Sequence, residues 1–260
     1  MSELRADPLT GLRVLLAGDG ESLAPGTDDA PPGWAGAVGA NPNRDLFWTA
    51  PARGWEERLP FSPEATTETT AEAMEGWRER MLAHADAAYV HVYADLPGEE
   101  ARLVALPFVP QLVAREREHF TAYATRTMGG NLLADLLQEE VRKRERIVAI
   151  DDDAVLMAPY GARVPYQLLL VPRRPRRAFE EPGPTGASLL ADGLRRLEAR
   201  FGELPPLSLW VRTAPSGAEH FCWRIDVLPR LHLQTGLELG TGLQHNTVAP
   251  EAVAAELREL

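Results

Sequence analysis

The stretch that decides the fold is residues 220–251, HFCWRIDVLPRLHLQTGLELGTGLQHNTVAPE. At its start, aromatic and β-branched residues alternate with polar ones: Phe221, Trp223, Ile225 and Val227 against Cys222, Arg224 and Asp226. This period of two predicts a half-buried antiparallel strand. Pro229 is expected to end the strand, because proline cannot donate to a sheet ladder. The glycine-spaced residues 235–243 are expected to form a second strand, followed by a short terminal helix from Pro250.

One face of the first predicted strand presents Cys222, Arg224 and Asp226 in a row. Neighbours on one face of a strand are about 6–7 Å apart. A thiol, a guanidinium and a carboxylate at this spacing are suitable for the floor of a functional site. An ordinary polar sheet face gives the same pattern, so the pattern alone leaves both interpretations open.

The same stretch resembles the C-terminal signature of the galactose-1-phosphate uridylyltransferase family, part of the histidine-triad (HIT-like) superfamily. That signature reads His-Trp-His-Ile-(Asp/Glu), then Leu-Pro-Arg-Leu, Gly-x-Glu-x-Gly-Thr-Gly, Asn and Pro-Glu. The matching residues are Trp223, Ile225, Asp226, Leu228 to Leu231, Gly236, Glu238, Gly240 to Gly242, Asn246, Pro250 and Glu251. Both histidines are replaced, by Cys222 and Arg224.

A second matching segment lies in the first half of the chain. Family members have Leu-Pro-His-x-His-x-Gln-Leu-Val, in which the second histidine accepts the uridylyl group. Leu-Pro at 96–97 and Leu-Val at 103–104 match at the same spacing. The resemblance then puts Gly98 at the first histidine, Glu100 at the nucleophile and Arg102 at the glutamine. The nucleophilic imidazole is therefore missing.

The resemblance implies an α+β fold of two tandem HIT-like halves, with antiparallel sheets packed against helices. We expect an N-terminal half at residues 1–150, shortened relative to the family, and a C-terminal half at 151–260, joined in one compact unit. A weak internal repeat agrees with two halves, since ARLVALPFVP and WRIDVLPRL both place a polar strand just before Leu-Pro. The segment 158–167 resembles Ala-Pro-Tyr-x-x-Arg-x-Pro-Tyr-Glu, with Arg163 matching and Gln167 in the glutamate's place. A homodimer is implied by the resemblance.

Cysteine content and charge exclude several classes of site. Cys222 is the only cysteine, so the chain has no intramolecular disulfide and no Cys-x-x-Cys metal site. We predict no metal and no cofactor, and we interpret residues 151–153, three aspartates, as a solvated turn. The net charge of −11, from 27 Lys and Arg against 38 Asp and Glu, argues against nucleic-acid binding. No segment has the roughly 20 apolar residues of a membrane span, and a cytoplasmic protein is expected.

Other patterns place the remaining elements. Ser62 before Pro63 predicts a helix start, with a helix to about residue 83 and Met74, Trp77 and Met81 on its buried face. Helical spacing over 116–137 is interrupted at Gly129-Gly130, after which Asn131 is expected to cap a second helix. Strands are expected at 88–93, 146–150 and 207–213, two strands within 155–171, and a helix at 189–201. The basic run 173–177, RRPRR, predicts an exposed loop or a patch that contacts phosphate.

Three functions are compatible with these residues. The chain is a non-catalytic relative that retains a nucleotide or sugar-phosphate ligand or a regulatory role, an active nucleotidyltransferase with another nucleophile, or a fold whose cleft has closed. For an active enzyme, Glu100 and Cys222 are the candidate nucleophiles. The candidate ligand-binding residues are Arg102, Arg163, Arg212, Arg224, Asp226 and Asn246. The deciding observation is whether Glu100 and the arginines at 102, 212 and 224 line one open pocket.

Overall fold

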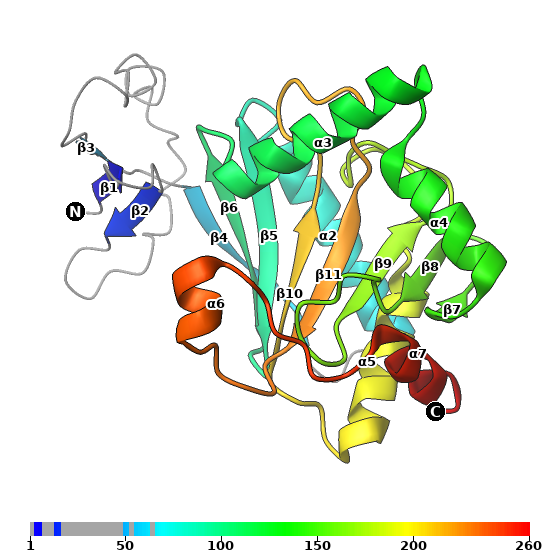
Figure 1. Ribbon diagram of the computed structural model, residues 1–260. Coiled ribbons are helices and arrows are strands. Elements are labelled where there is room, and N and C mark those ends of the chain that lie inside the picture. Colours follow the sequence, from blue (N-terminus) through cyan, green and yellow to red (C-terminus); the bar gives the residue numbers. More distant parts are fainter. Residues whose placement is uncertain (1–2, 7–12, 17–48, 52–54, 63–65) are drawn as a thin grey trace.

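The structure is a computed structural model that describes residues 3–6, 13–16, 49–51, 55–62 and 66–260 (Figure 1). Three short strands, β1 (Glu3–Ala6), β2 (Arg13–Leu16) and β3 (Thr49–Pro51), form a small antiparallel sheet in the order β2-β1-β3. Residues 18–45 are rich in Gly, Pro, Asp and Ala, a composition that predicts a loop, and they lie outside the described residues.

An eight-stranded sheet forms the centre of the protein. Its strands follow the order β4-β6-β5-β10-β11-β9-β8-β7, and every neighbouring pair is antiparallel. The strands are β4 (Trp55–Pro60), β5 (Tyr89–Leu96), β6 (Glu100–Leu106), β7 (Ile147–Ile150), β8 (Ala154–Met157), β9 (Leu168–Pro172), β10 (Leu207–Arg212) and β11 (Arg224–Pro229). β5 pairs with β10 and so joins the strands of the first half to those of the second.

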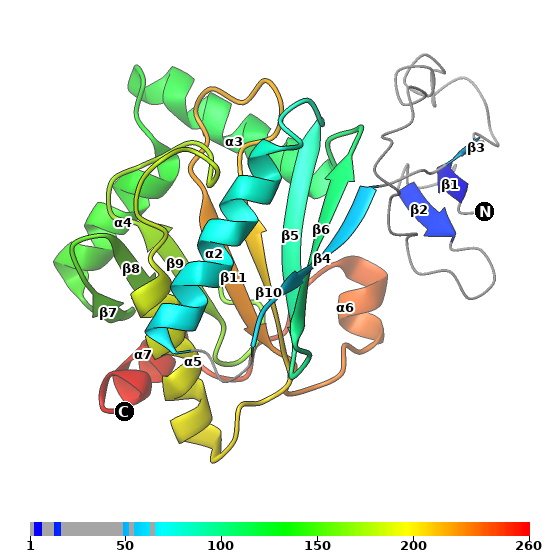
Figure 2. The same ribbon diagram turned by 180° about the vertical axis from the view of Figure 1, so that it is seen from behind.

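Helices cover both faces of this sheet. Helices α2 (Thr67–Leu82) and α5 (Ala187–Phe201) lie side by side on one face, as Figure 2 shows. Helices α3 (Gln111–Thr127) and α4 (Leu132–Lys143) lie on the other face, and α7 (Pro250–Arg258) packs against α5 and β7 (Figure 1). Among the described helices, none is both long and apolar enough to cross a membrane. The α+β fold with an antiparallel sheet is confirmed.

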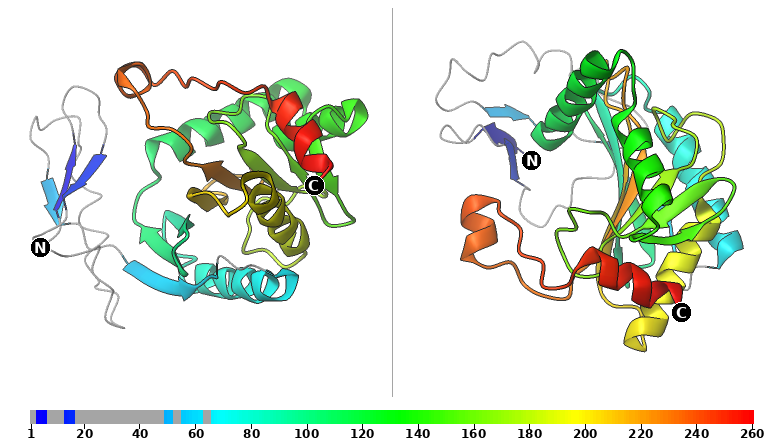
Figure 3. Two further views of the ribbon diagram at one scale, coloured as in Figure 1. Left: turned by 90° about the horizontal axis from the view of Figure 1, so that it is seen from below. Right: turned by 45° about the vertical axis from the view of Figure 1, so that its right-hand side comes forward.

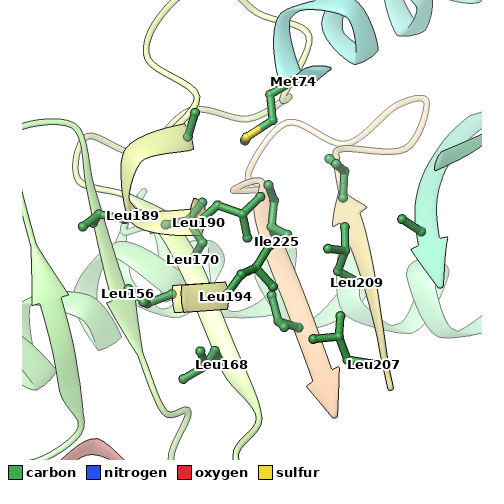
Figure 4. Close-up of a cluster of buried hydrophobic side chains, with 14 of the residues drawn as sticks. Met74, Leu156, Leu168, Leu170, Leu189, Leu190, Leu194, Leu207, Leu209 and Ile225 are labelled. Atoms are coloured by element: carbon green, nitrogen blue, oxygen red, sulfur yellow. The ribbon is translucent and has the colours of Figure 1, made fainter. Parts of the chain in front are cut away.

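The main core fills the space between the sheet and the helices α2 and α5. Met74, Trp77 and Met81 recur at three- and four-residue spacing and are almost fully buried, as their helical periodicity predicts. Leucines of α5 and of the strands meet them, and Figure 4 shows Met74 above Leu190 and Ile225. Val92 and Leu209 contribute from the same sheet face, whose side chains alternate with those of the opposite face.

The structure corrects the strand expected at residues 235–243. This stretch is the short helix α6 (Gly236–Thr241), which projects from the body of the protein (Figure 3). Its start is a capping box in which Thr235 and Glu238 satisfy each other's backbone N–H groups. Gly242 ends the helix in the left-handed conformation at φ 74°. The glycines of this stretch therefore belong to a short helix, which Gly242 ends, and they do not mark a strand.

Other element boundaries shift by a few residues. Helix α2 starts at a Thr66 N-cap rather than at Ser62. The strand expected from residue 221 begins at Arg224. The predicted Asn131 cap is confirmed, because its side chain accepts a hydrogen bond from the backbone N–H of Ala134. The basic run 173–177 is a mostly exposed loop, as one of its two interpretations predicts, in which Arg176 donates to the carbonyls of Glu181 and Pro184.

Candidate functional site

The sheet face opposite the main core carries a continuous polar row. Cross-strand pairing aligns Arg58 with Arg102, Arg102 with Tyr93, Tyr93 with Trp210, and Trp210 with Asp226. Residues paired across antiparallel strands point to the same face, with Cβ atoms about 5 Å apart. The row thus brings charged and aromatic side chains from five strands together on one surface.

An aromatic column on β5 crosses this row. The rings of Tyr89 and His91 stack at a centroid distance of 5.9 Å, and those of His91 and Tyr93 at 5.7 Å. Burial, with a smaller contribution from Arg212, lowers the pKa of His91 to about 3. The imidazole is therefore neutral at physiological pH.

An open cleft of about 780 Å³ lies at the β4, β6 and β5 end of the polar row. Its lining residues are Arg58, Leu59, Pro60, Tyr93, Asp95, Pro97, Gly98, Glu99, Glu100 and Arg102. Within it, Arg58 Nη1 lies 3.5 Å from Glu100 Oε2. The cleft therefore combines two guanidinium groups, a tyrosine and three carboxylates in a solvent-accessible space.

A second group of charges lies beneath helix α3, away from the cleft. Arg224 Nη2 donates to Glu116 Oε1 at 3.1 Å, and Arg224 Nε lies 3.3 Å from Asp226 Oδ2. Arg212 Nε lies 3.5 Å from the other oxygen of Glu116. Burial opposes the charge of Arg224, but Asp226 and Glu116 outweigh it and raise its pKa. Both arginines are thus held in ion pairs and do not line the cleft with Arg102.

Cys222 is buried in a separate cluster. It is 1% exposed, and its thiol donates a weak hydrogen bond to the carbonyl of Trp223 at 3.6 Å. Burial raises the pKa of this thiol to about 11, and the nearby Arg176 and Arg224 only partly offset the rise. Arg224 does lower the pKa of the Cys222 thiol, but desolvation of the thiolate is the larger effect, so Arg224 does not activate Cys222 as a nucleophile.

Arg163 and Asn246 meet at the loop between β8 and β9. The guanidinium of Arg163 lies over the Trp210 ring, 5.5 Å from its centroid. The side-chain amide of Asn246 donates to the carbonyls of Ala162 and Val164, which flank Arg163. Asn246 therefore holds the backbone that presents Arg163 to the polar face.

No family model matches the chain. It is 26% identical to a galactose-1-phosphate uridylyltransferase of Cryptococcus neoformans, over 86% of this chain and 69% of that protein. It is 25% identical to an ADP-glucose phosphorylase of Arabidopsis thaliana, over 64% of this chain and 48% of that protein.

Solved structures show the same fold. A uridylyltransferase aligns with a TM-score of 0.78 at 18% identity, over 99% of this chain and 98% of the other. The Arabidopsis ADP-glucose phosphorylase with bound ADP-glucose aligns with a TM-score of 0.69 at 20% identity, over 80% of this chain and 72% of the other. The chain is a divergent relative of the galactose-1-phosphate uridylyltransferases.

At two positions the chain differs from the family motif that it resembles. By its resemblance to the family motif, Glu100 stands at the nucleophile's position, and the structure places it in the open cleft. Arg224 stands where the family motif has a histidine, and its guanidinium places a positive charge beside Glu116 and Asp226. Among the described residues, no three His, Cys, Asp or Glu side chains are grouped to hold a metal ion. The absence of metal and cofactor stays a prediction.

The candidate residues thus lie in several separate places, with Cys222 buried apart from the others and Asn246 beside the loop of Arg163. Glu100 and Arg102 share the cleft, Arg212, Arg224 and Asp226 lie under α3, and Arg163 lies over Trp210 between them. Sequence reasoning missed three contributors. Arg58 and Tyr93 lie at polar positions of strands, so the alternation of polar and apolar residues in the sequence could have identified them. No signal in the sequence distinguishes Glu116 from the other charged residues of its helix.

Proposed function

We propose that this chain binds a nucleotide or a sugar phosphate in the cleft on β4, β6 and β5, without the uridylyl transfer that its relatives' names describe. The residues at 100, 102, 212 and 224 do not line one pocket, but Glu100 and Arg102 lie together in one open cleft, and this placement carries the proposal. The site retains groups for binding, whereas the resemblance leaves no imidazole at the nucleophile's position.

The cleft residues match the chemistry of such a ligand. Guanidinium groups form strong charge-assisted hydrogen bonds with phosphate, and Arg58 and Arg102 are cross-strand partners on the same face. Tyr93 is the member of the aromatic column that pairs with Arg102 across the strands, and its ring gives a base or a sugar ring an apolar surface. Carboxylates such as Asp95 and Glu99 accept hydrogen bonds from sugar hydroxyls.

Calorimetry with a panel of nucleotides and sugar phosphates tests the binding. For any phosphate ligand that binds, Arg102→Ala is expected to weaken it by about 10- to 100-fold, the size of a charged hydrogen bond. Arg142→Ala is the control, because Arg142 lies on the exposed side of α4 and pairs only with Glu139 among the contacts seen. No binding by any member of the panel, or an unchanged dissociation constant in Arg102→Ala, would contradict the proposal.

The loss of transfer has a chemical reason. In the family reaction a neutral imidazole attacks the α-phosphorus, and the sugar 1-phosphate leaves. Imidazole is suited to this step because it is nucleophilic when neutral and leaves easily when protonated. A carboxylate oxygen of Glu100 would form an acyl phosphate instead, and its negative charge opposes approach of the phosphate.

An active nucleotidyltransferase that uses Glu100 is the second candidate. It is favoured by the ion pair between Glu100 and Arg58, which offsets the repulsion between the carboxylate and a phosphate. Incubation with UDP-glucose or ADP-glucose labelled in the α-phosphate distinguishes the two. We expect no label on the denatured protein. Hydroxylamine-sensitive label on Glu100, with release of glucose 1-phosphate, would establish the active enzyme.

The homodimer that the resemblance implies is part of this proposal. Light scattering at micromolar concentration should then give twice the chain mass of 28.6 kDa. A monomeric mass at that concentration would contradict the dimer, and it would leave the proposal for the ligand site unchanged.

A further inference from the structure

Buried polar atoms without a hydrogen bond are concentrated on one part of the sheet. Among the described residues, six such atoms lie on the polar face or on the helix above it: Tyr89 Oη, His91 Nδ1, Glu116 Oε2, Trp210 Nε1, Arg212 Nε and Asp226 Oδ2. Three of these residues, Tyr89, Arg212 and Asp226, are at most 9% exposed. Leaving such a group unpaired costs about 1–3 kcal/mol, so native proteins pair them with protein, water or ligand.

This lack of partners is not general in the protein. The equally buried Arg146 makes three hydrogen bonds to Glu140 and one to Glu251. Arg212, in contrast, interacts with the Tyr89 hydroxyl and forms an ion pair at 3.5 Å with Glu116, and its Nε makes no hydrogen bond. The cluster under α3 therefore has unused donors beside two buried positive charges.

Glu116 differs from its partners in exposure and attachment. Arg212, Arg224 and Asp226 extend from adjacent sheet strands, whereas Glu116 reaches down from helix α3. Its side chain is 29% exposed, against 6% for that of Asp226. Glu116 can therefore turn outward to solvent, while Asp226 stays with Arg224.

The donors around Glu116 suit an anion with more oxygens than a carboxylate. Tyr89 lies on the same sheet face as Arg212, because Val211 and Val92 pair across the strands and point to the opposite face. Burial raises the pKa of Tyr89, and the charge and hydrogen bond of the neighbouring Arg212 oppose this rise. A carboxylate offers two oxygens, and one of them makes the single hydrogen bond to Arg224. A tetrahedral oxyanion offers four, enough for both guanidinium groups and the Tyr89 hydroxyl.

We propose that Arg212, Arg224 and Tyr89 form a second anion site under α3, separate from the cleft, in which the Glu116 carboxylate is an internal occupant. A small oxyanion such as inorganic phosphate or sulfate displaces Glu116 and takes its place. With Glu116 turned away, the two arginines and Asp226 leave one net positive charge for the anion.

Thermal unfolding of Glu116→Ala with added phosphate tests this site. Removing the carboxylate leaves Arg212 without its partner, so the variant should unfold at a lower temperature than wild type. Phosphate should then raise its midpoint saturably, by about 3 °C or more at ten times the dissociation constant. Wild type should respond less, because Glu116 competes. Sodium chloride at equal ionic strength controls for screening.

Matched variants separate this site from the cleft. Glu118→Ala, an exposed position on the same helix, should behave as wild type. The phosphate response should persist in Glu116→Ala with Arg102→Ala, which removes the cleft arginine. It should vanish in Glu116→Ala with Arg212→Met, which removes both partners of the ion pair and leaves Arg224 with Asp226.

The outcomes decide the proposal in either direction. If Glu116→Ala does not fold, Glu116→Gln replaces it, since glutamine keeps the shape and removes the charge. A saturable response that depends on Arg212 supports the site. No response beyond that of Glu118→Ala, or one that disappears with Arg102 and not with Arg212, would overturn it.

Discussion

Glu100 Oε2 lies 3.5 Å from Arg58 Nη1 across the β6–β4 pair, and both side chains are about half exposed, at 49% and 59%. An exposed ion pair of this kind stabilises a protein by only about 0–1 kcal/mol. The pair therefore contributes little to stability. Arg58 can release the carboxylate of Glu100 and bind a phosphate of a ligand instead.

Glu100→Gln is expected to tighten the binding of a phosphate ligand several-fold. The substitution removes a negative charge from the cleft and releases Arg58, while the free energy of unfolding should change by less than about 1 kcal/mol. Calorimetry and urea unfolding measure the two effects. Glu118→Gln, outside the cleft, is the control, and weaker binding in Glu100→Gln would indicate that the carboxylate contacts the ligand directly.

The Cys222 thiol should be unreactive in the native protein at pH 8. Its side chain is buried and its pKa is about 11, so only about one thiol in a thousand is ionised at that pH. A colourimetric thiol reagent should therefore react only after guanidinium unfolding, with one equivalent per chain. Rapid reaction of the folded protein would restore Cys222 as a candidate nucleophile.

Protonation of His91 should destabilise the protein in acid. The folded-state pKa of about 3 is below the usual 6.5, so the unfolded chain binds a proton more readily between these values. Stability should then be full above about pH 6.5 and fall toward pH 3, by up to about 1.4 kcal/mol per pH unit from this group.

Comparing variants isolates the histidine's share of that acid sensitivity. His91→Phe keeps the stack with Tyr89 and Tyr93 and should flatten the dependence between pH 4 and 6.5, measured by urea unfolding. His119→Phe, at an exposed position of α3, should leave the dependence as in wild type. An equal slope in wild type and His91→Phe would rule out His91 as its source.

Two glycines on the helices of the main core should respond to alanine in opposite ways. A Cβ on Gly193 would lie 2.9 Å from Leu156 Cδ2, so Gly193→Ala should destabilise the fold by about 1–3 kcal/mol. A Cβ on Gly76 meets nothing within 4 Å, so Gly76→Ala should stabilise α2 by up to about 1 kcal/mol. Chemical denaturation measures both, and equal effects would contradict the close packing of α5.

Two neighbouring glutamates of α4 should differ in their effect on stability. Glu140 is buried against Arg146, whereas Glu139 pairs with Arg142 at the surface. Glu140→Ala leaves a buried guanidinium with fewer partners and should cost about 3–5 kcal/mol, against less than about 1 kcal/mol for Glu139→Ala. Similar unfolding midpoints for the two variants would mean that Glu251 alone satisfies Arg146.

The sequence by itself determined the elements that local patterns encode. Period-two alternation located β5 and β11, and the helical spacing of Met74, Trp77 and Met81 gave the buried face of α2. The resemblance to the family gave the α+β class, and its motif aligns Glu100 and Arg102 with the nucleophile and the glutamine, an alignment that stays a prediction. The division into halves at residues 1–150 and 151–260 stays a prediction.

Only the tertiary structure decided how the charged residues group. Arg224 and Glu116 are 108 residues apart in the chain, and they meet because β11 lies in the middle of the sheet with α3 across it. A strand pattern states which residues share a face, but it does not state which helix covers that face. The pairing of β5 with β10 and the position of α3 separate Arg212 and Arg224 from the cleft that holds Arg102, because strand order and helix packing depend on contacts between distant parts of the chain.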